Sequence, residues 1–252
     1  MKRILITGAA SGIGLATAHR FHARGWYVGL LDIDVEGLKA VAVALGERTW
    51  CQALDVRDAH ACQAAADEFA SQQGGIDVLF NSAGVLRMGP LEEIPEADHA
   101  LMLDINVRGL LNMCRAALAH LKQAPNGRVL NMSSASALYG VPDMAVYSAS
   151  KFAVRGLTEA LNLEWQRHGV TVQDLMPPFV DTRMVRGQQW QAPVVKRMGV
   201  KLSADDIAEA AEKALLVHRV HTPVGLSFRL TVLMEKLTPR SFTREVMRLL
   251  SR

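Results

Sequence analysis

Cysteine is scarce in this sequence, and its cysteines lie far apart. Cys51, Cys62 and Cys114 are odd in number and form no C-x-x-C pair. Such a set argues against a disulfide framework and against a zinc site built from cysteine pairs. It is typical of a reducing compartment, so we expect a cytoplasmic protein, and we expect no metal.

The sequence also lacks a strong excess of one charge and a long apolar run. Its 28 basic and 25 acidic residues give a net charge of +3, which is too small to indicate disorder or a nucleic-acid-binding surface. No segment reaches the ~18 apolar residues of a membrane span. The apolar stretch Ile4–Ile6 is too short for a signal peptide. We therefore expect no nucleic-acid partner and no spanning segment.

Half of the residues are hydrophobic, and they form strand-like and helical patterns that alternate along the chain. Its 252 residues, 50% of them hydrophobic, suffice for a single domain over residues 1–252 with a large core. Continuously apolar, strand-like runs lie at Arg3–Ile6, Tyr27–Leu31, Thr49–Leu54, Val78–Phe80, Arg128–Met132 and Val170–Leu175. Helical patterns lie between and after them at Ile13–Ala23, Gly37–Leu45, His60–Gln72, Ala97–Lys122 and Ala145–Arg167. The alternation predicts an α/β fold, a doubly wound parallel sheet flanked by helices, with a ligand crevice at the carboxyl ends of the strands.

A glycine-rich turn follows the first strand. Gly8, Gly12 and Gly14 are placed where the backbone must turn tightly, approach a ligand and open a helix. Free backbone N–H groups at a helix N-terminus suit a pyrophosphate. A plain strand-to-helix turn would show the same glycines, so the turn alone leaves both readings open.

An acidic residue ends the second strand. Asp32 follows the glycine-rich turn by nearly the ~20 residues at which, in dinucleotide-binding folds, a carboxylate accepts a hydrogen bond from the adenosine ribose hydroxyl. A 2′-phosphate there would meet a like charge, and neither Ala10 nor Ile33 offers a cation. This favours NAD over NADP, whereas a solvated loop carboxylate beside Asp34 is the alternative interpretation.

A phenol and an amine share one face of a predicted helix. Tyr147 and Lys151 are four residues apart, and a nearby cation lowers the pKa of a phenol, as proton exchange near neutral pH requires. The pair alone is often an ordinary surface pair. Ser133 and Ser134 end the fifth strand, however, so a hydroxyl can reach the same crevice.

These motifs, in this order, resemble the short-chain dehydrogenase/reductase family over about residues 2–182. The motifs that match are Thr7–Gly14, Asp32, Asp55-Val56, Asn81–Gly84, Asn106, Ser134 and Tyr147-x-x-x-Lys151. The resemblance implies a Rossmann-like fold and hydride transfer between a nicotinamide and an alcohol or ketone carbon. It also implies a homodimer or homotetramer that pairs through the helices near Ala97–Lys122 and Ala145–Arg167.

The resemblance implies a role for each catalytic candidate. Tyr147 would be the general acid/base and Ser134 would hold the substrate oxygen. Lys151 would lower the pKa of the phenol and bind the nicotinamide ribose, and Asn106 would order a water on the proton relay. The expected cofactor contacts are Gly8, Ser11, Gly12, Ile13, Gly14, Asp32, Asp55, Val56, Asn81, Ala83, Gly84, Tyr147, Lys151, Pro177, Val180 and Thr182.

Two points in this set stay open. Asn81 and Gly84 could equally serve to tie strands together. Pro178 stands where the family usually has glycine, and proline fixes φ and removes an N–H. The geometry beside the nicotinamide therefore departs from the usual pattern.

The segment after Thr182 is expected to be a substrate lid at residues 183–204. It holds five basic residues and no acidic one, with apolar residues between them. A closing lid excludes water, and its apolar residues favour a hydrophobic alcohol or ketone such as a steroid, retinoid or other lipid-like compound. The cations would also allow an anionic tail, and a solvated positive loop is an equal alternative.

The C-terminal part, residues 226–252, departs most from the family pattern. Apolar and basic residues recur at helical spacing in Ser241–Arg252, which predicts an amphipathic basic helix. Such a helix can make weak contact with an anionic membrane surface, or it can pack on its own domain or on a partner subunit.

Alternative functions remain at the level of the sequence. The leading hypothesis is an NAD-dependent oxidoreductase for a hydrophobic secondary alcohol or ketone. A non-catalytic nicotinamide-binding regulatory protein, or a reductase of small or CoA-linked ketones, would carry many of the same motifs.

Overall fold

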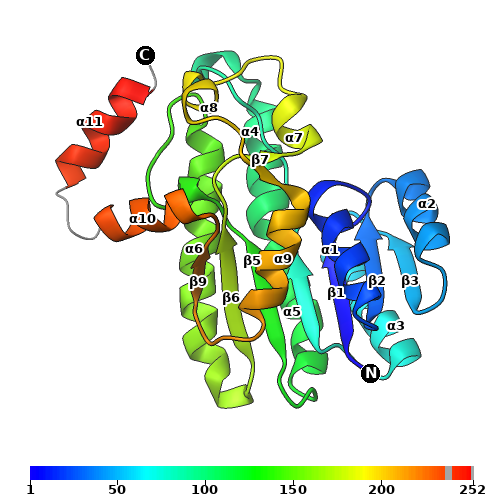
Figure 1. Cartoon of the computed structure of the whole chain (residues 1–252). Helices are drawn as coiled ribbons and strands as arrows, with labels where there is room; N and C mark the ends of the chain where they lie inside the picture. Colours follow the sequence, from blue (N-terminus) through cyan, green and yellow to red (C-terminus); the bar gives the residue numbers. More distant parts are fainter. Residues whose placement is uncertain (236–239, 251–252) are drawn as a thin grey trace.

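A parallel sheet with the strand order β3-β2-β1-β4-β5-β6-β9 forms the centre of the molecule (Figure 1). The computed structural model describes residues 1–235 and 240–250, without the side chains of 235, 240–242 and 244. The strands are β1 Arg3–Thr7, β2 Tyr27–Asp32, β3 Thr49–Ala53, β4 Val78–Asn81, β5 Arg128–Met132, β6 Thr171–Met176 and β9 His221–Pro223. The strand order reverses between β1 and β4, which places a ligand crevice at their carboxyl ends. The predicted doubly wound sheet is confirmed.

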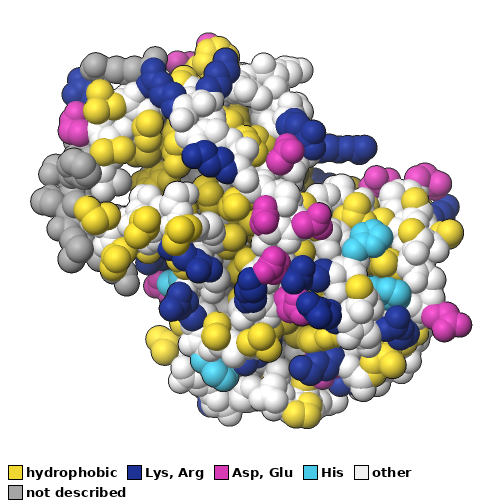
Figure 2. Space-filling model, in the orientation of Figure 1, with side chains coloured by type: hydrophobic (Ala, Val, Ile, Leu, Met, Phe, Trp, Pro, Cys, Tyr) yellow, Lys and Arg dark blue, Asp and Glu magenta, His cyan; other side chains and the backbone are white. Residues whose placement is uncertain are grey.

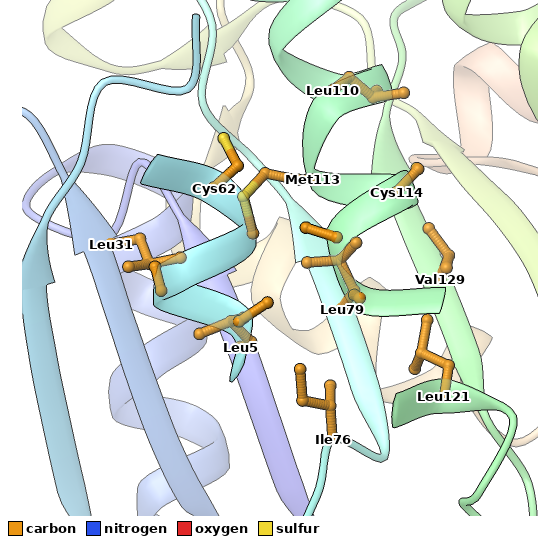
Figure 3. Close-up of a cluster of buried hydrophobic side chains, with 14 of the residues drawn as sticks. Leu5, Leu31, Cys62, Ile76, Leu79, Leu110, Met113, Cys114, Leu121 and Val129 are labelled. Carbon is orange, nitrogen blue, oxygen red and sulfur yellow. The ribbon is translucent and has the colours of Figure 1, made fainter. Parts of the chain in front are cut away.

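Helices cover both faces of this sheet. The first layer contains α1 Gly12–Ala23, α2 Val35–Leu45 and α9 Ala204–Ala214, and the second contains α3 Ala59–Gln73, α5 Leu110–Leu121 and α6 Ala145–Trp165. Successive strand side chains point to opposite faces, so Ile4 and Ile6 pack toward the first layer and Leu5 toward the second. Figure 3 shows Leu5, with Leu31 and Leu79, among side chains from α3 and α5.

The helical stretch expected near Ala97–Lys122 is present, and its hydrogen-bond pattern changes in the middle. The chain forms α4 Glu96–Leu103, then a π-helical segment Asp104–Gly109, and then α5. Gly109 explains the close packing there, because a Cβ on it would lie 2.5 Å from Cγ2 of Val56. Asn106 lies within this π-helical segment, and such segments are frequent at functional sites.

Several short elements were not predicted, because two to six residues are too few to show a hydrophobic period. They include β9, which extends the sheet beyond β6, and a separate parallel pair formed by β7 Val180–Asp181 and β8 Leu202–Ser203. The short helices α7 Arg183–Arg186 and α8 Pro193–Met198 lie between β7 and β8, and 3₁₀ turns occur at Leu91–Glu93, Ala135–Ala137 and Gln166–His168.

The C-terminal part contains α10 Leu226–Glu235 and α11 Arg240–Leu250. Phe228 anchors α10 in the core, whereas Leu226, Leu230 and Leu233 are exposed. Figure 2 shows hydrophobic side chains gathered at the left of the molecule, where α10 lies in Figure 1. Met247 of α11 is buried against the 183–204 segment. The predicted amphipathic pattern of Ser241–Arg252 lies partly outside the described residues, because the side chains of 241, 242 and 244 and the whole of 251 and 252 are not described. Within residues 1–235 and 240–250, every helix is too short or too polar to cross a bilayer.

Candidate functional site

A cavity of about 450 Å³ opens at the carboxyl ends of the central strands. Most of the residues predicted for the site line it together: Gly8, Ser11, Gly12, Ile13, Asp32, Asp55, Val56, Ala83, Gly84, Ser134, Tyr147, Lys151, Pro177, Val180 and Thr182. The other predicted residues, Gly14, Asn81 and Asn106, lie outside this lining. The structure thus brings together residues that are up to 174 positions apart, from Gly8 to Thr182 (182 − 8).

Two glycines of the turn adopt a backbone conformation that side chains rarely allow. Gly8 has φ +68°, and a Cβ on it would also lie only 2.9 Å from the backbone of Ala83. Gly12 has φ +54°, although a Cβ on it would make only ordinary contact with Cγ2 of Thr182, at 3.6 Å. The N-terminus of α1 begins at Gly12, and its first amides lack partners inside the helix. The turn therefore offers N–H donors beside the cavity, as a pyrophosphate requires.

Two carboxylates lie at the ends of β2 and β3. Asp32 accepts from the backbone N–H groups of Ala10 and Asp34, each at 3.0 Å, which fixes the carboxylate at the edge of the cavity. Asp55 pairs with the guanidinium of Arg57, with Nη2 2.6 Å from Oδ2. The hydrogen bonds from Arg57 lower the pKa of Asp55, so this carboxylate stays ionised.

Asn81 is buried and ties the strands of the sheet together. Its Nδ2 donates to Oδ1 of Asn131 at 2.9 Å. Thr7, at the end of β1, accepts from the backbone N–H groups of Ser82 and Ala83 at 3.1 and 3.0 Å. These bonds fix the carboxyl ends of β1, β4 and β5 relative to one another, and thereby the floor of the cavity.

Tyr147 and Ser134 meet at the cavity wall. The Tyr147 phenol hydrogen-bonds with Ser134, while burial raises the pKa of Tyr147 to about 12. Ser134 is held in place by its neighbour, because its Oγ accepts from the N–H of Ser136 at 3.1 Å. The hydroxyl and the phenol can therefore bind one substrate oxygen between them.

Lys151 lies one helical turn after Tyr147 and is almost completely buried. Its Nζ donates to the carbonyl of Met132 at 2.8 Å and lies 5.5 Å from the centroid of the Tyr147 ring. Burial lowers the pKa of Lys151 to about 8, and the negative charge of Asp174 opposes that decrease. The amine is thus poised between its charged and neutral forms near physiological pH.

Asn106 holds the loop after β4 against α6. Its Oδ1 accepts from the N–H of Val85 at 2.8 Å, and its Nδ2 donates to the carbonyl of Val85 at 2.9 Å. The same Nδ2 donates to Oγ of Ser150 at 3.1 Å, and Ser150 donates to the carbonyl of Tyr147 at 2.7 Å. The side chain of Asn106 therefore fixes the position of the first turns of α6.

The part of the site next to Tyr147 is apolar. Leu86, Met144, Phe179, Met184 and Val185 pack with the phenol in one cluster and line the cavity. This wall combines the loop after β4, the start of α6 and the segment that begins at residue 183.

Gln188 was not among the predicted residues, although it joins two walls of this apolar part. Its Nε2 donates to the carbonyls of Leu86 and Met184 at 3.0 and 2.7 Å, and its Oε1 accepts from the N–H of Met88 at 3.0 Å. A glutamine between basic and apolar residues carries no signal in the sequence that could have identified it.

A glycine-rich turn, an acidic strand end and a serine–tyrosine–lysine group around one cavity define a nicotinamide-dependent oxidoreductase. A family model described as "short chain dehydrogenase" matches residues 2–192. The chain therefore belongs to the short-chain dehydrogenase/reductase family, and it is an oxidoreductase that interconverts a secondary alcohol and a ketone with a nicotinamide cofactor.

Relatives and solved structures agree with this assignment. The chain is 38% identical to D-threitol dehydrogenase of Mycolicibacterium smegmatis, over 83% of this chain and 84% of the relative. It is 33% identical to galactitol 2-dehydrogenase of Agrobacterium fabrum, over 88% and 86%. It also resembles the crystal structure of a short-chain dehydrogenase/reductase from Burkholderia phymatum in complex with NAD, with a TM-score of 0.83, 29% identity and coverage of 92% and 91%.

Proposed function

We propose that the chain is an NAD-preferring dehydrogenase/reductase for a hydrophobic secondary alcohol or ketone. In this proposal Tyr147 is the general acid/base and Ser134 holds the substrate oxygen. The observation that carries it is the contact between the Tyr147 phenol and Ser134 at the wall of the cavity, with the Lys151 amine behind them.

The lining of the cavity fits a dinucleotide. The α1 amides and the glycine turn would hold the pyrophosphate, and Asp32 would accept from the adenosine ribose. Asp55 and Val56 would contact the adenine, Ala83 and Gly84 would border the cofactor, and Val180 and Thr182 would hold the carboxamide. When bound, the nicotinamide supplies or accepts the hydride.

Asp32 supports the preference for NAD. Its carboxylate is fixed at the edge of the cavity by two backbone N–H groups, and among the described residues no cation forms an ion pair with it. A 2′-phosphate would therefore meet an uncompensated negative charge.

The proton moves on this chain's own side chains. During alcohol oxidation, the Tyr147 oxygen accepts the hydroxyl proton of the substrate while Ser134 donates to the same oxygen. The Lys151 charge stabilises the phenolate that Tyr147 must form, since a cation nearby lowers the pKa of a phenol. In ketone reduction the same proton returns from Tyr147.

The apolar wall supports a hydrophobic substrate. Leu86, Met144, Phe179, Met184 and Val185 surround the phenol. Each buried methylene contributes about 0.8 kcal/mol, which is about fourfold in an equilibrium constant. A steroid, retinoid or other lipid-like alcohol would use this wall, with residues 183–204 serving as its lid.

A polyol is the second candidate, because the relatives are named D-threitol dehydrogenase and galactitol 2-dehydrogenase. A polyol needs hydrogen-bonding partners for its additional hydroxyl groups. Backbone groups and the hydroxyls of Ser134 and Tyr147 lie beside the apolar wall, and a polyol would use them as hydrogen-bonding partners.

The test measures reduction of NAD and of NADP with 2-alkanols of increasing chain length, a steroid alcohol, a retinoid, a hydroxyacyl-CoA and the polyols D-threitol, galactitol and sorbitol. We expect kcat/KM to increase about fourfold for each added methylene and to favour NAD. Tyr147→Phe should lower kcat by about 10²–10⁴ while NADH still binds. Preference for a polyol would reject the hydrophobic substrate, and preference for NADP would reject the role of Asp32. Cofactor binding without turnover of any compound would favour a regulatory protein.

A further inference from the structure

A series of charged side chains runs from the surface of α6 into the interior beneath the catalytic group. Nε of Arg155 lies 3.1 Å from Oε1 of Glu159, and the same oxygen lies 2.8 Å from Nε2 of His221. Nδ1 of His221 in turn lies 2.9 Å from Oδ2 of Asp174. The series starts at half-exposed residues and ends at Asp174, whose side chain has no exposed surface.

Asp174 lies on β6, next to β5, the strand to which Lys151 donates a hydrogen bond. It pairs in register with Asn131 of β5, and the following residue, Met132, accepts the bond from Nζ of Lys151. Asn131 is neutral and is already bonded to Asn81 and Thr158. The second oxygen of Asp174, Oδ1, is buried and has no hydrogen-bond partner among the described residues.

The geometry around His221 indicates an imidazolium. A neutral imidazole carries one N–H, whereas His221 places each ring nitrogen within 2.9 Å of a carboxylate oxygen, of Asp174 and of Glu159. Both nitrogens can donate only in the protonated ring. Burial opposes this charge, but the two carboxylates outweigh it and raise the pKa of His221. Burial raises the pKa of Asp174 above its ordinary value, and the hydrogen bond and charge of a protonated His221 oppose this increase and favour the ionised carboxylate.

We infer that Asp174 is a positioning residue for proton transfer: its buried carboxylate is the counter-charge that keeps Lys151 protonated, and His221 keeps that carboxylate ionised. This inference rests on the roles proposed above for Tyr147 and Lys151. Asp174 lies outside the lining of the cavity, so in this inference it acts on proton transfer without contact with the substrate oxygen.

The surroundings of both groups support the inference. The described charged groups that act on Asp174 are His221 from β9 and Arg155 and Glu159 from α6, and the charge of Asp174 in turn acts on Lys151 of α6. Burial disfavours the charged form of Lys151, and Asp174 is the negative charge that opposes this effect. Two opposite charges in a buried site interact strongly because little water screens them.

The expected direction follows from these charges. Removal of the Asp174 carboxylate lowers the pKa of Lys151, so less of the amine is charged at a given pH. The Tyr147 phenolate then loses stabilisation, and the pKa of the phenol rises. The pH at which alcohol oxidation accelerates therefore moves upward.

The test titrates Lys151 by NMR in protein whose lysines are isotopically labelled at Cε, with the signal assigned through Lys151→Arg. We expect a midpoint near 8 in the wild type and a decrease of about one pH unit in Asp174→Asn. Asp174→Ser, which is neutral and smaller, should show the same decrease if the asparagine variant does not fold. Asp67→Asn is the matched control, because it removes a carboxylate that bonds to His120 at 2.7 Å and is not among the charges that act on Lys151.

An unchanged Lys151 midpoint in a folded neutral variant would overturn the inference, and so would an equal decrease in Asp67→Asn. Histidine NMR on the wild-type protein gives a second decision: a neutral His221 at pH 7 would also overturn it. Neither measurement needs turnover, so failure of the inference is distinguishable from failure of the proposed function. With an active substrate, the pH profile of kcat/KM should shift upward in Asp174→Asn.

Discussion

Gly14 lies directly against Gly8, so that a Cβ on Gly14 would come 2.1 Å from the carbonyl oxygen of Gly8. The two glycines are six positions apart, one at the end of β1 and one in the first turn of α1. The contact joins backbone to backbone, so a side chain could not be accommodated by a rotamer change. The turn that borders the cavity therefore has no room for even the methyl group of an alanine at position 14.

Gly14→Ala is expected to disrupt this turn. The variant should lose more than about 2 kcal/mol of the free energy of unfolding and should bind NADH at least tenfold more weakly. Urea unfolding and NADH fluorescence measure the two effects. Val43→Ala is the control, because Val43 is 83% exposed on α2. Alanine there should change the free energy of unfolding by less than about 0.5 kcal/mol; wild-type NADH affinity in Gly14→Ala would contradict the prediction.

Gln188→Leu is expected to loosen the wall beside the substrate. The change removes three hydrogen bonds that link residues 86–88 to the segment after residue 183. KM for the substrate should rise about five- to tenfold, the loss of about one net hydrogen bond, while kcat changes less. Steady-state kinetics measures KM and kcat, and the control is Gln189→Leu, at the neighbouring exposed residue. Equal KM values in the two variants would show that Gln188 does not hold the wall.

The pair of Arg3 and Asp77 should make stability depend on acid pH. Burial favours the neutral form of Asp77, but the hydrogen bonds and charge of Arg3 outweigh it and lower its pKa. A carboxyl with a lowered folded-state pKa stabilises the fold above its unfolded pKa, about 4, and loses this contribution as the pH falls.

Asp77→Asn should therefore cost about 1–2 kcal/mol at pH 7, and this cost should shrink as the pH falls below about 4. Urea unfolding of both proteins from pH 7 down to pH 3 measures the difference. Arg3 contacts both oxygens of Asp77, through Nε and Nη2, each at 2.8 Å, and an asparagine keeps only one of the two acceptor oxygens. A constant difference across this pH range would show that the pair does not titrate.

The outer face of α6 should bind a second copy of the chain. Phe152 and Leu163 are 44% and 70% exposed on this helix, and their spacing of eleven residues places them on one face. The family resemblance predicts a pair through this helix. Light scattering after gel filtration should give at least a dimer for the wild type and a monomer for Leu163→Glu. Val43→Glu, at an 83% exposed residue of α2, is the control; a monomeric wild type would contradict the prediction.

The fold was predictable because its main signals are local. Each long strand is a continuous apolar run such as Val78–Phe80, and the turn at Gly8–Gly14 and the pair Tyr147–Lys151 show their spacing directly in the sequence. Their convergence on one cavity follows from the rule that parallel strands end at the same edge. Sequence order and strand order together therefore predict where the site lies.

What the sequence could not show depends on contacts between distant residues. The pair of His221 and Asp174 joins positions 47 apart in the chain, and the bond from Gln188 to Leu86 joins positions 102 apart. The π-helical segment around Asn106 packs against Val56 through Gly109 and bonds to Val85 through Asn106. Helix propensity and hydrophobic period carry no information about such pairs.

The packing of α11 against α8 has a practical consequence for anyone who produces this protein. An affinity tag fused after Leu250 would start beside the apolar wall of the pocket, where Met247 is already buried. The start of β1 lies at the opposite end of the molecule, far from α11 (Figure 1). Tags, surface-immobilisation handles and fluorescent reporters therefore belong before Met1.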